Sequence, residues 1–481
     1  MVKRILLFLL AALAVLVVVL LVNTVRYTSR QVVAAASPAP APTDNSIQHF
    51  QQAIGYKTIS YSDSSQLDTA QFLGFHRFLE KTYPALHRAL TREKVARYSL
   101  LYTWPGRNPQ LKPVVLMAHQ DVVPIEEATR TKWTVDPFAG TLKENFIWGR
   151  GATDDKINLI SIFETVEKLV VENFQPERTI YLSFGHDEET GGKGAKAVAA
   201  LLHSRSVHAD LVLDEGGIIT SDKIPGMTKP VALIGNSEKG YLSLELSVEK
   251  NGGHSSQPES ETSIDILAAA MLKIRSNPFE ARISESTNGF LDHIGPEMPF
   301  LKRIIFANRW LFKGTIIGIY EKSPAGNAVM RTTAVPTIIH AGIKDNVVPT
   351  VATGIVNFRL LPGDASTQVI EKVKHAVNDE RVKIAVAYNF ISEASPVTPE
   401  KSFAFEKIER TIRQVYPAAI CAPFMMIGGT DSRHFYGVSD GVIKFSPMVD
   451  PIGFHGIDER VSLESFGLAQ WFYERLLRDL K

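Results

Sequence analysis

The stretch "YLSFGHDEETGG", from Tyr181 to Gly192, decides the fold of this chain. Its first half belongs to an apolar run, Ile180–Phe184, which is typical of a buried β-strand. Three consecutive acids, Asp187, Glu188 and Glu189, follow shortly after that run. Adjacent carboxylates repel one another, so the plainest interpretation is a solvated loop. The alternative is that a cation binds there and offsets their charge.

Two further apolar runs resemble this one and also end in polar residues. Val114–Ala118 leads into His119 and Asp121, and Leu211–Leu213 leads into Asp214. Helical patterns separate the three runs. This alternation predicts an α/β fold whose parallel sheet carries helices on both faces. Ligands bind at the carboxyl ends of such strands, so we expect the acids and the imidazole to converge.

Two more polar clusters lie elsewhere in the chain. In "WGRGATDDK", Asp154 stands just before a helix that begins near Lys156, where a carboxylate gains from the helix dipole or simply caps the helix. The late segments "FHGIDE" and "GGTDSRHF" supply His455, Asp431 and Arg433. Each cluster alone is most simply a satisfied polar turn. Their significance is joint, because all of them stand at strand ends or in loops.

The chain changes character near Gly240. Alternating strands and two helical patterns then predict a smaller α+β domain over residues 240–395, which interrupts a catalytic domain made of residues 47–239 and 396–481. The aromatic, irregular segment Phe279–Pro324 is expected to be an insertion inside the smaller domain. If it lines the site, it favours a bulky apolar substrate group.

Taken in order, six motifs resemble those of the dinuclear zinc exopeptidases and deacylases. They are "MAHQDVVP", "WGRGATDDK", "GHDEETGG", "VLDEGG", "GGHSSQP" and "GGTDSR" with "FHGIDE". This family includes carboxypeptidase S, aminoacylase, succinyl-diaminopimelate desuccinylase and glutamate carboxypeptidase. The similarity runs from about Ile47 to the end of the chain. "LDEGG" and the apolar amino terminus favour the membrane-tethered carboxypeptidase S and N-acyl-amino-acid hydrolase branch.

The resemblance implies two Zn²⁺ ions, for which Co²⁺ or Mn²⁺ are possible substitutes. Asp154 would bridge the two ions. His119 and Asp214 would complete one metal site, and Glu189 with His455 the other.

The resemblance also implies catalytic roles. Asp121 would orient His119 from behind, and Glu188 would be the general base for the attacking water. His254, in "GGHSSQP", would stabilise the tetrahedral oxyanion after domain closure or from across a homodimer interface. Three further residues would bind the substrate: Asn346, Arg359 and Arg433.

The amino terminus contains eighteen uncharged apolar residues, Ile5–Val22. At about 1.5 Å per residue this run spans roughly 27 Å, close to the thickness of the hydrocarbon core. A cleaved signal peptide is the alternative, because Ala34–Ser37 resembles a cleavage site. The length of the run, with Arg26 and Arg30 after it, favours an uncleaved anchor.

We therefore expect a transmembrane anchor over residues 1–23 and a Pro/Ala linker over residues 24–46. A short cytoplasmic amino end would place the body on the non-cytoplasmic side of the membrane. The stretch "SPAPAPTDN" is expected to act as a stiff spacer that holds the body off the bilayer.

Composition excludes several other classes. The formal net charge of +1 gives no global field for nucleic acid. A single cysteine, Cys421, excludes thiolate metal sites, so any metal must bind to His, Asp and Glu.

The sequence thus predicts a membrane-anchored, two-zinc amidohydrolase that acts on small peptides or N-acyl amino acids with a free carboxylate. One alternative is a narrow-specificity N-acetyl or N-succinyl amino-acid deacylase. Another is an inactive, membrane-tethered binding protein, which the complete ligand set disfavours.

Overall fold

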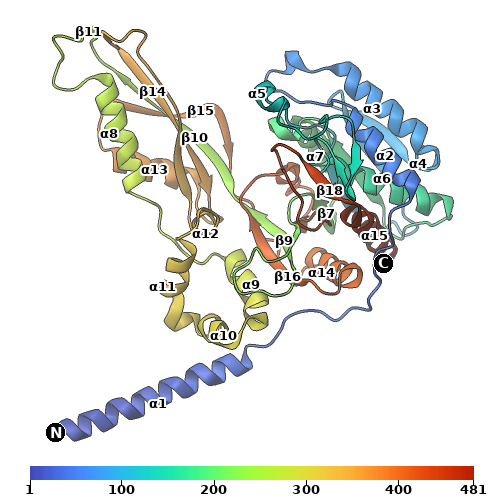
Figure 1. Ribbon diagram of the computed structural model, residues 1–481, viewed down its shortest axis with the longest axis horizontal. Coiled ribbons are helices and arrows are strands. Elements are labelled where there is room, and N and C mark those ends of the chain that lie inside the picture. Colours follow the sequence, from blue (N-terminus) through green and yellow to red (C-terminus); the bar gives the residue numbers. More distant parts are fainter. Residues whose placement is uncertain (481) are drawn as a thin grey trace.

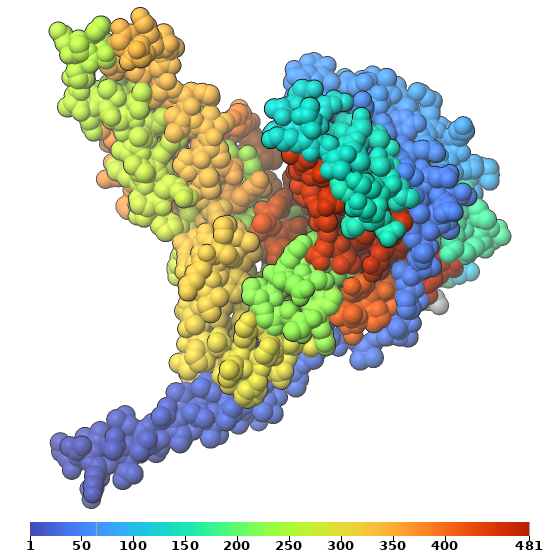
Figure 2. Space-filling model, viewed as in Figure 1, coloured from blue at the N-terminus to red at the C-terminus, as the bar shows by residue number. Residues whose placement is uncertain are grey.

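The structure is a computed structural model that describes residues 1–480. Figure 1 shows two units joined near their base, with the amino-terminal helix α1 (Val2–Arg26) projecting from that base. The larger unit is built on a nine-stranded sheet and the smaller on a four-stranded sheet. Figure 2 shows that the far ends of the two units are separate lobes.

The large sheet is mixed, whereas the sequence predicted a parallel one. Its centre, β6-β3-β7-β17, is parallel, but β2 pairs antiparallel with β6, and β17 with β9. The connection from β1 to β2 has only three residues, and so short a link permits only an antiparallel hairpin. In sheet order, with β8 (Ile219–Thr220) beside β9, the strands are β1 (Thr91–Val95), β2 (Ser99–Trp104), β6 (Ile180–Gly185), β3 (Val114–His119), β7 (Leu211–Asp214), β17 (Val442–Lys444), β9 (Val231–Glu238) and β16 (Ile420–Met426).

Helices cover both faces of this sheet, as predicted. Successive side chains of a strand point to opposite faces, so Leu116 of β3 packs in one core and Val115 in another. The core around Leu116 includes residues of α6 (Lys156–Val171) and α15 (Leu463–Asp479), and the core around Val115 includes residues of α7 (Lys193–Ser204). The helices of the larger unit are α2 (Asp44–Gly55), α3 (Thr69–Thr82), α4 (Pro84–Ala89), α5 (Glu127–Arg130), α6 (Lys156–Val171), α7 (Lys193–Ser204), α14 (Phe403–Val415) and α15 (Leu463–Asp479).

A small three-stranded sheet joins distant parts of the larger unit. β5 (Phe146–Trp148) pairs with β4 (Thr141–Lys143) on one side and with β18 (Arg460–Ser462) on the other. Trp148 lies opposite Arg460 in this pairing. The loop after β5 is therefore held beside the loop before β18, although some 300 residues separate them in sequence.

The smaller unit has its own hydrophobic core. Helices α8 (Ser263–Ser276) and α13 (Ser366–Val377) pack on one face of the sheet β12-β14-β10-β15. A two-stranded ribbon of β11 (Gly253–His254) and β13 (Val347–Val348) stands at its far tip (Figure 1). The four strands of the sheet are β12 (Thr333–Ala341), β14 (Val351–Leu360), β10 (Gly240–Glu249) and β15 (Val382–Ser392).

The segment Phe279–Pro324 lies between α8 and β12 of the smaller unit in sequence, and Phe279 packs in the core of that unit. Its first helix, however, leaves the smaller unit and packs on β16, the edge strand of the large sheet. Phe290, Leu291 and Ile294 share a core with Ile420, because the apolar face of the first helix finds its partner there. Its helices are α9 (Glu285–Ile294), α10 (Phe300–Ala307) and α11 (Arg309–Tyr320), and α12 (Pro324–Met330) leads back to β12.

The Pro/Ala segment after α1 is not a free spacer. The side chain of Gln31 donates to the carbonyl of Cys421 at 2.9 Å and accepts from its amide at 2.7 Å. Trp471 donates to the carbonyl of Ser37 at 2.6 Å. A proline-rich strand has no internal hydrogen bonds, so its backbone groups bind the neighbouring body instead. The expectation of a stiff spacer is therefore wrong. The segment is a strap that lies along the larger unit.

Candidate metal centre and active site

His119, at the end of β3, stands at the centre of a buried polar cluster. Its Nδ1 lies 2.9 Å from the backbone oxygen of Asp121, which can only accept, so Nδ1 donates there and Nε2 is the ring nitrogen that faces the cluster. Nε2 lies 2.8 Å from Oδ1 of Asp154 and 3.2 Å from Oε1 of Glu215. A metal ion that displaced the Nε2 proton would bind this nitrogen, because Nδ1 is already committed to the backbone oxygen.

Asp154 is shared between two histidines. Its second oxygen, Oδ2, lies 2.7 Å from Nε2 of His455, which follows β17 in the loop before β18. Nε2 of His455 also lies 3.2 Å from Oε1 of Glu189, an oxygen that is buried without a hydrogen-bond partner. The structure therefore brings His119, Asp154, Glu189 and His455 together. One carboxylate with each oxygen turned to a different imidazole is the arrangement that a bridging ligand requires.

Asp121 contacts both His119 and the Glu188–Glu189 turn and holds them in place. Its Oδ2 accepts from the hydroxyl of Ser60 at 2.6 Å, and its two oxygens accept from the backbone amides of Glu188 and Glu189 at 3.1 and 3.2 Å. Its Oδ1 also lies 3.3 Å from Nδ1 of His119. One buried carboxylate thus ties the end of β3 to the acidic turn after β6.

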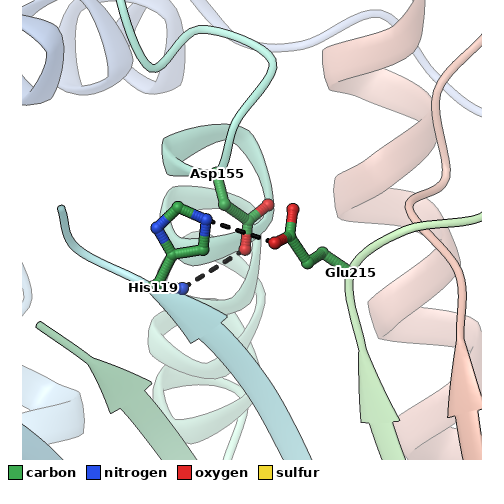
Figure 3. A group of neighbouring side chains, drawn as sticks. All are labelled: His119, Asp155 and Glu215. Carbon is green, nitrogen blue, oxygen red and sulfur yellow. Dashed lines mark hydrogen bonds and ion pairs between the residues drawn. The ribbon is translucent and has the colours of Figure 1, made fainter. Parts of the chain in front are cut away.

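Glu215, and not Asp214, faces His119, which differs from the sequence prediction. Both oxygens of Asp214 accept backbone hydrogen bonds, from Glu215 at 3.0 Å and from Ser432 at 2.7 Å. The turn at Gly216, with φ of +132°, follows directly. Figure 3 shows Glu215 and Asp155 meeting beside the His119 ring. Glu215 therefore replaces Asp214 in the candidate ligand set, and Asp155 is a further acid that the sequence had not singled out.

The loop that carries Asp154 is held by a buried ion pair that sequence reasoning missed. Glu459 lies 2.6 Å from Arg150 and accepts from the amide and the hydroxyl of Thr153 at 2.8 and 2.9 Å. Arg150 also donates to the carbonyl of Gly456 at 3.2 Å. The only sequence signal was the acid that ends "FHGIDE". This pair fixes the Asp154 loop against the His455 loop.

The cluster contains more carboxyl groups than the neighbouring imidazoles can neutralise. Burial, with the charges of Asp154 and Asp155, raises the pKa of Glu215 well above its usual range. Burial opposes it, but hydrogen bonds from His119 and His455 lower the pKa of Asp154. A hydrogen bond to Asp154 and the nearby Glu189 carboxylate raise the pKa of His455 to about 10.

This donor set fits divalent cations. Two groups of three residues each offer ligand atoms that lie within 4.8 Å of one another. One group is His119, Asp155 and Glu215, and the other is His119, Asp154 and Glu189. Imidazole nitrogen and carboxylate oxygen are ligands that Zn²⁺ accepts. The unpartnered oxygen of Glu189 would gain a ligand bond, and added positive charge would offset the crowded carboxylates.

Glu188 stands in the same turn as Glu189 but is outside both ligand groups. Burial and the charge of Asp431 raise its pKa well above the usual range, and His119 and Arg433 act in the opposite direction. Asp431 itself is buried with neither oxygen hydrogen-bonded, pressed against Gly185 and Gly192. A Cβ atom at either glycine would overlap its carboxylate, so the two glycines are needed for this close packing.

Of the predicted substrate-binding residues, Arg359 belongs to the smaller unit and Arg433 to the larger unit. Arg359, on β14, lies over the ring of Tyr241 at 4.9 Å. Burial, together with the charge of nearby Arg433, lowers the pKa of Arg359. The charge of Arg433 also lowers the pKa of Glu188, against the larger effect of burial.

His254 and Asn346 lie together, but apart from the cluster. His254 pairs with Val347 in the ribbon at the tip of the smaller unit, and Ser255 donates to the carbonyl of Asn346 at 3.2 Å. Figure 1 places this tip far from β7 and β18. The arrangement of the two units in this structure therefore does not bring His254 to the cluster.

Comparison with known proteins identifies the family. Residues 115–479 match the family model described as Peptidase family M20/M25/M40. Probable carboxypeptidase S-like 2 of Dictyostelium discoideum is 38% identical over 480 residues, which cover 96% of this chain and 92% of that protein. Human N-fatty-acyl-amino acid synthase/hydrolase PM20D1 is 38% identical over 437 residues, which cover 89% of this chain and 86% of that protein.

Solved structures share the fold. The M20 family metallo-carboxypeptidase Sso-CP2 of Sulfolobus solfataricus has a TM-score of 0.66 at 18% identity, covering 91% of this chain and 99% of its own. Human carnosine dipeptidase 1 has a TM-score of 0.63 at 15% identity, covering 91% and 100%. At these identities the likeness shows the fold alone.

Proposed function

Because this chain belongs to Peptidase family M20/M25/M40 and is a metallopeptidase or amidohydrolase, we propose a sharper assignment. In this proposal the protein is a membrane-anchored, two-zinc hydrolase that cleaves the amide bond of small peptides or N-acyl amino acids carrying a free carboxylate. The observation that carries the two-metal proposal is the Asp154 carboxylate, with one oxygen on His119 and the other on His455.

Four residues besides the bridging Asp154 would hold the ions. His119 with Glu215 would serve one ion, and His455 with Glu189 the other. Zn²⁺ in these positions would polarise the amide carbonyl and make the attacking water more acidic. Asp121 keeps His119 in the tautomer that presents Nε2.

Glu188 is the proposed general base. Its neighbour Glu189 lies 3.2 Å from His455, whereas Glu188 is outside both ligand groups and its pKa responds to the charges of Asp431 and Arg433. A base must take the proton of the attacking water and give it to the leaving amine. A side chain bound to metal cannot do this, so two adjacent glutamates fill two roles.

Arg359 and Arg433 are the proposed site for the substrate carboxylate. A guanidinium binds a carboxylate through two parallel hydrogen bonds. One arginine comes from each unit, so a bound carboxylate would draw the two units together. Such closure, or a homodimer formed through the smaller unit, would bring His254 and Asn346 to the reacting amide.

The relatives support two substrate classes. One is named as carboxypeptidase S-like and another as an N-fatty-acyl-amino acid synthase/hydrolase. Both classes have an amide next to an amino-acid carboxylate. A narrow N-acetyl or N-succinyl deacylase is the remaining alternative within this chemistry.

The anchor is α1, whose length and apolar composition suit a membrane span. A cleaved signal sequence would have the same length and apolar composition. The strap after α1 favours an uncleaved α1, because Gln31 and Ser37 of the strap are hydrogen-bonded to the larger unit. We place the body on the non-cytoplasmic side.

The test uses the full chain, purified in detergent and assayed with and without a chelator. The panel contains mixed dipeptides, fatty-acyl amino acids, N-acetyl amino acids and the matching amino-acid amides, which lack the carboxylate. The proposal expects two equivalents of zinc, turnover lost with the chelator and restored by Zn²⁺, and little turnover of the amides. Turnover of acetyl substrates alone would assign the narrow deacylase. A chain without zinc that cleaves nothing in the panel would contradict the proposal.

A further inference from the structure

The helical pair α10 and α11 has an unusual composition for a surface segment. The stretch Phe300–Tyr320 contains four basic residues and no acid. Aromatic and branched apolar residues fill most of its other positions. This combination is typical of helices that lie in the interface of a membrane with anionic lipids.

The apolar side chains of this pair are exposed to a degree that a soluble surface seldom shows. Leu301 is 77% exposed and Trp310 is 62% exposed. Three more large apolar side chains are also exposed: Phe300, Leu311 and Ile319. An exposed apolar patch of this kind indicates a binding surface.

The pair adjoins the end of α1, as Figures 1 and 2 show. Asn23 donates to the side chain of Asn308 at 2.9 Å, and Asn308 donates to the carbonyl of Leu20 at 3.1 Å. Arg309 donates to the hydroxyl of Tyr27 at 3.2 Å. These polar contacts begin where the apolar run Ile5–Val22 ends, which is where a spanning helix would leave the hydrocarbon.

From this geometry we infer that α10 and α11 form a second membrane contact. The pair lies in the headgroup region with Leu301 and Trp310 directed into the acyl chains, and the exposed Lys302 and Lys313 bind lipid phosphates. The inference rests on the proposed anchor, because α1 sets the level at which the pair meets the bilayer. It adds a surface that no hydrolase role requires.

This contact would fix the orientation of the whole enzyme. The pair follows α9, whose Phe290 and Leu291 are packed against β16 of the large sheet. Arg30 and Asp292 form an ion pair at 2.8 Å that joins the start of the strap to α9. A span held at one point could rotate freely, whereas a span with an adjoining interfacial pair holds the catalytic unit at one angle to the membrane.

The experiment uses the full chain in nanodiscs of phosphatidylcholine and phosphatidylserine. Cys421 is buried, so an introduced surface cysteine carries the spin label alone. Labels are placed by L301C and W310C, by V15C within the apolar run, and by V171C as the matched control. Val171 is also apolar and is 65% exposed, but it ends α6 on the opposite side of the larger unit (Figure 1).

Accessibility to oxygen and to a water-soluble nickel chelate is then measured by electron paramagnetic resonance. The inference expects an oxygen-to-nickel ratio at 301 and 310 severalfold above that at 171. Equal ratios at 301, 310 and 171, with a high ratio at 15, would overturn the second contact and leave the anchor in place. A low ratio at 15 would remove the anchor instead. Dipolar broadening between labels at 301 would identify a second copy as the occupant and also overturn the inference.

Discussion

Oδ2 of Asp154 lies 2.7 Å from Nε2 of His455, although the two residues are 301 positions apart in the chain. The contact exists because β5 and β18 pair and bring their adjoining loops side by side. His119 takes the other oxygen of the same carboxylate. The proposed two-metal chemistry depends on this one shared side chain.

The general base can be tested separately from the metal. Glu188→Gln removes the base but keeps the size of the side chain, and Glu188 is outside both ligand groups. We expect zinc content to stay at two equivalents while kcat falls by about 10²- to 10⁴-fold. Metal analysis and steady-state kinetics on the same preparation check this. A variant that keeps its zinc and most of its turnover would contradict the role.

Neighbouring acids in "LDEGG" give a matched pair for the metal site. Glu215→Gln removes a carboxylate that faces His119, so bound zinc should fall from two equivalents toward one. Asp214→Asn should keep both ions, because the amides of Glu215 and Ser432 hold Asp214. Zinc content after dialysis measures the difference. The reverse result would return Asp214 to the ligand set.

The ion pair of Arg150 and Glu459 should matter for stability. Arg150→Met leaves Glu459 buried without its partner, which typically costs about 3–5 kcal/mol. The double variant with Glu459→Gln removes the stranded charge and should recover part of that loss. Thermal unfolding of both variants tests this. Equal stability of Arg150→Met and the parent chain would show that the pair does not hold the loop.

A buried acid far from the site predicts a pH dependence. Burial and the charge of Glu400 raise the pKa of Glu409 from 4.5 to about 7. The folded state therefore binds a proton that the unfolded state releases, so stability falls as pH rises from about 4.5 to about 7 and stays lower above that. Glu409→Gln should match the parent chain at pH 4 and exceed it at pH 8 by up to about 3 kcal/mol. Unfolding curves at the two pH values check the sign, and a gain at pH 4 only would contradict it.

The route by which His254 reaches the site can be decided by mixing. His254→Ala and Glu188→Gln should each be nearly inactive and keep their zinc. If His254 acts across a homodimer, refolded or co-expressed mixtures of the two variants should regain part of the activity. If it acts by closure within one chain, the mixtures should stay inactive. Full activity of His254→Ala alone would remove this residue from the mechanism.

Motif order allowed the family to be predicted from the sequence, and the family match confirms it. Helices on both faces of the large sheet were also predictable, since the period of apolar residues reports them directly. The strand-end rule placed His119 and the Glu188–Glu189 turn at one edge, and the structure groups His119 with Glu189 there.

Other features could not be predicted in the same way. Asp214 and Glu215 are adjacent acids of one type, and only the turn at Gly216 and the amide of Ser432 decide which of them faces His119. The Pro/Ala stretch looked like a spacer because its partners, such as Trp471, are more than 400 positions away. The destination of Phe279–Pro324 depended on the free face of β16.

The sequence alone thus determined the class of the protein, because ligand type and motif order are local properties that chemistry restricts. Tertiary structure decided which acid faces which imidazole, where the strap and the α10–α11 pair lie, and how far His254 stands from the cluster. These depend on long-range pairing such as that of β5 with β18. Side-chain period and composition carry no record of such pairing, since both describe only a residue's immediate neighbours along the chain.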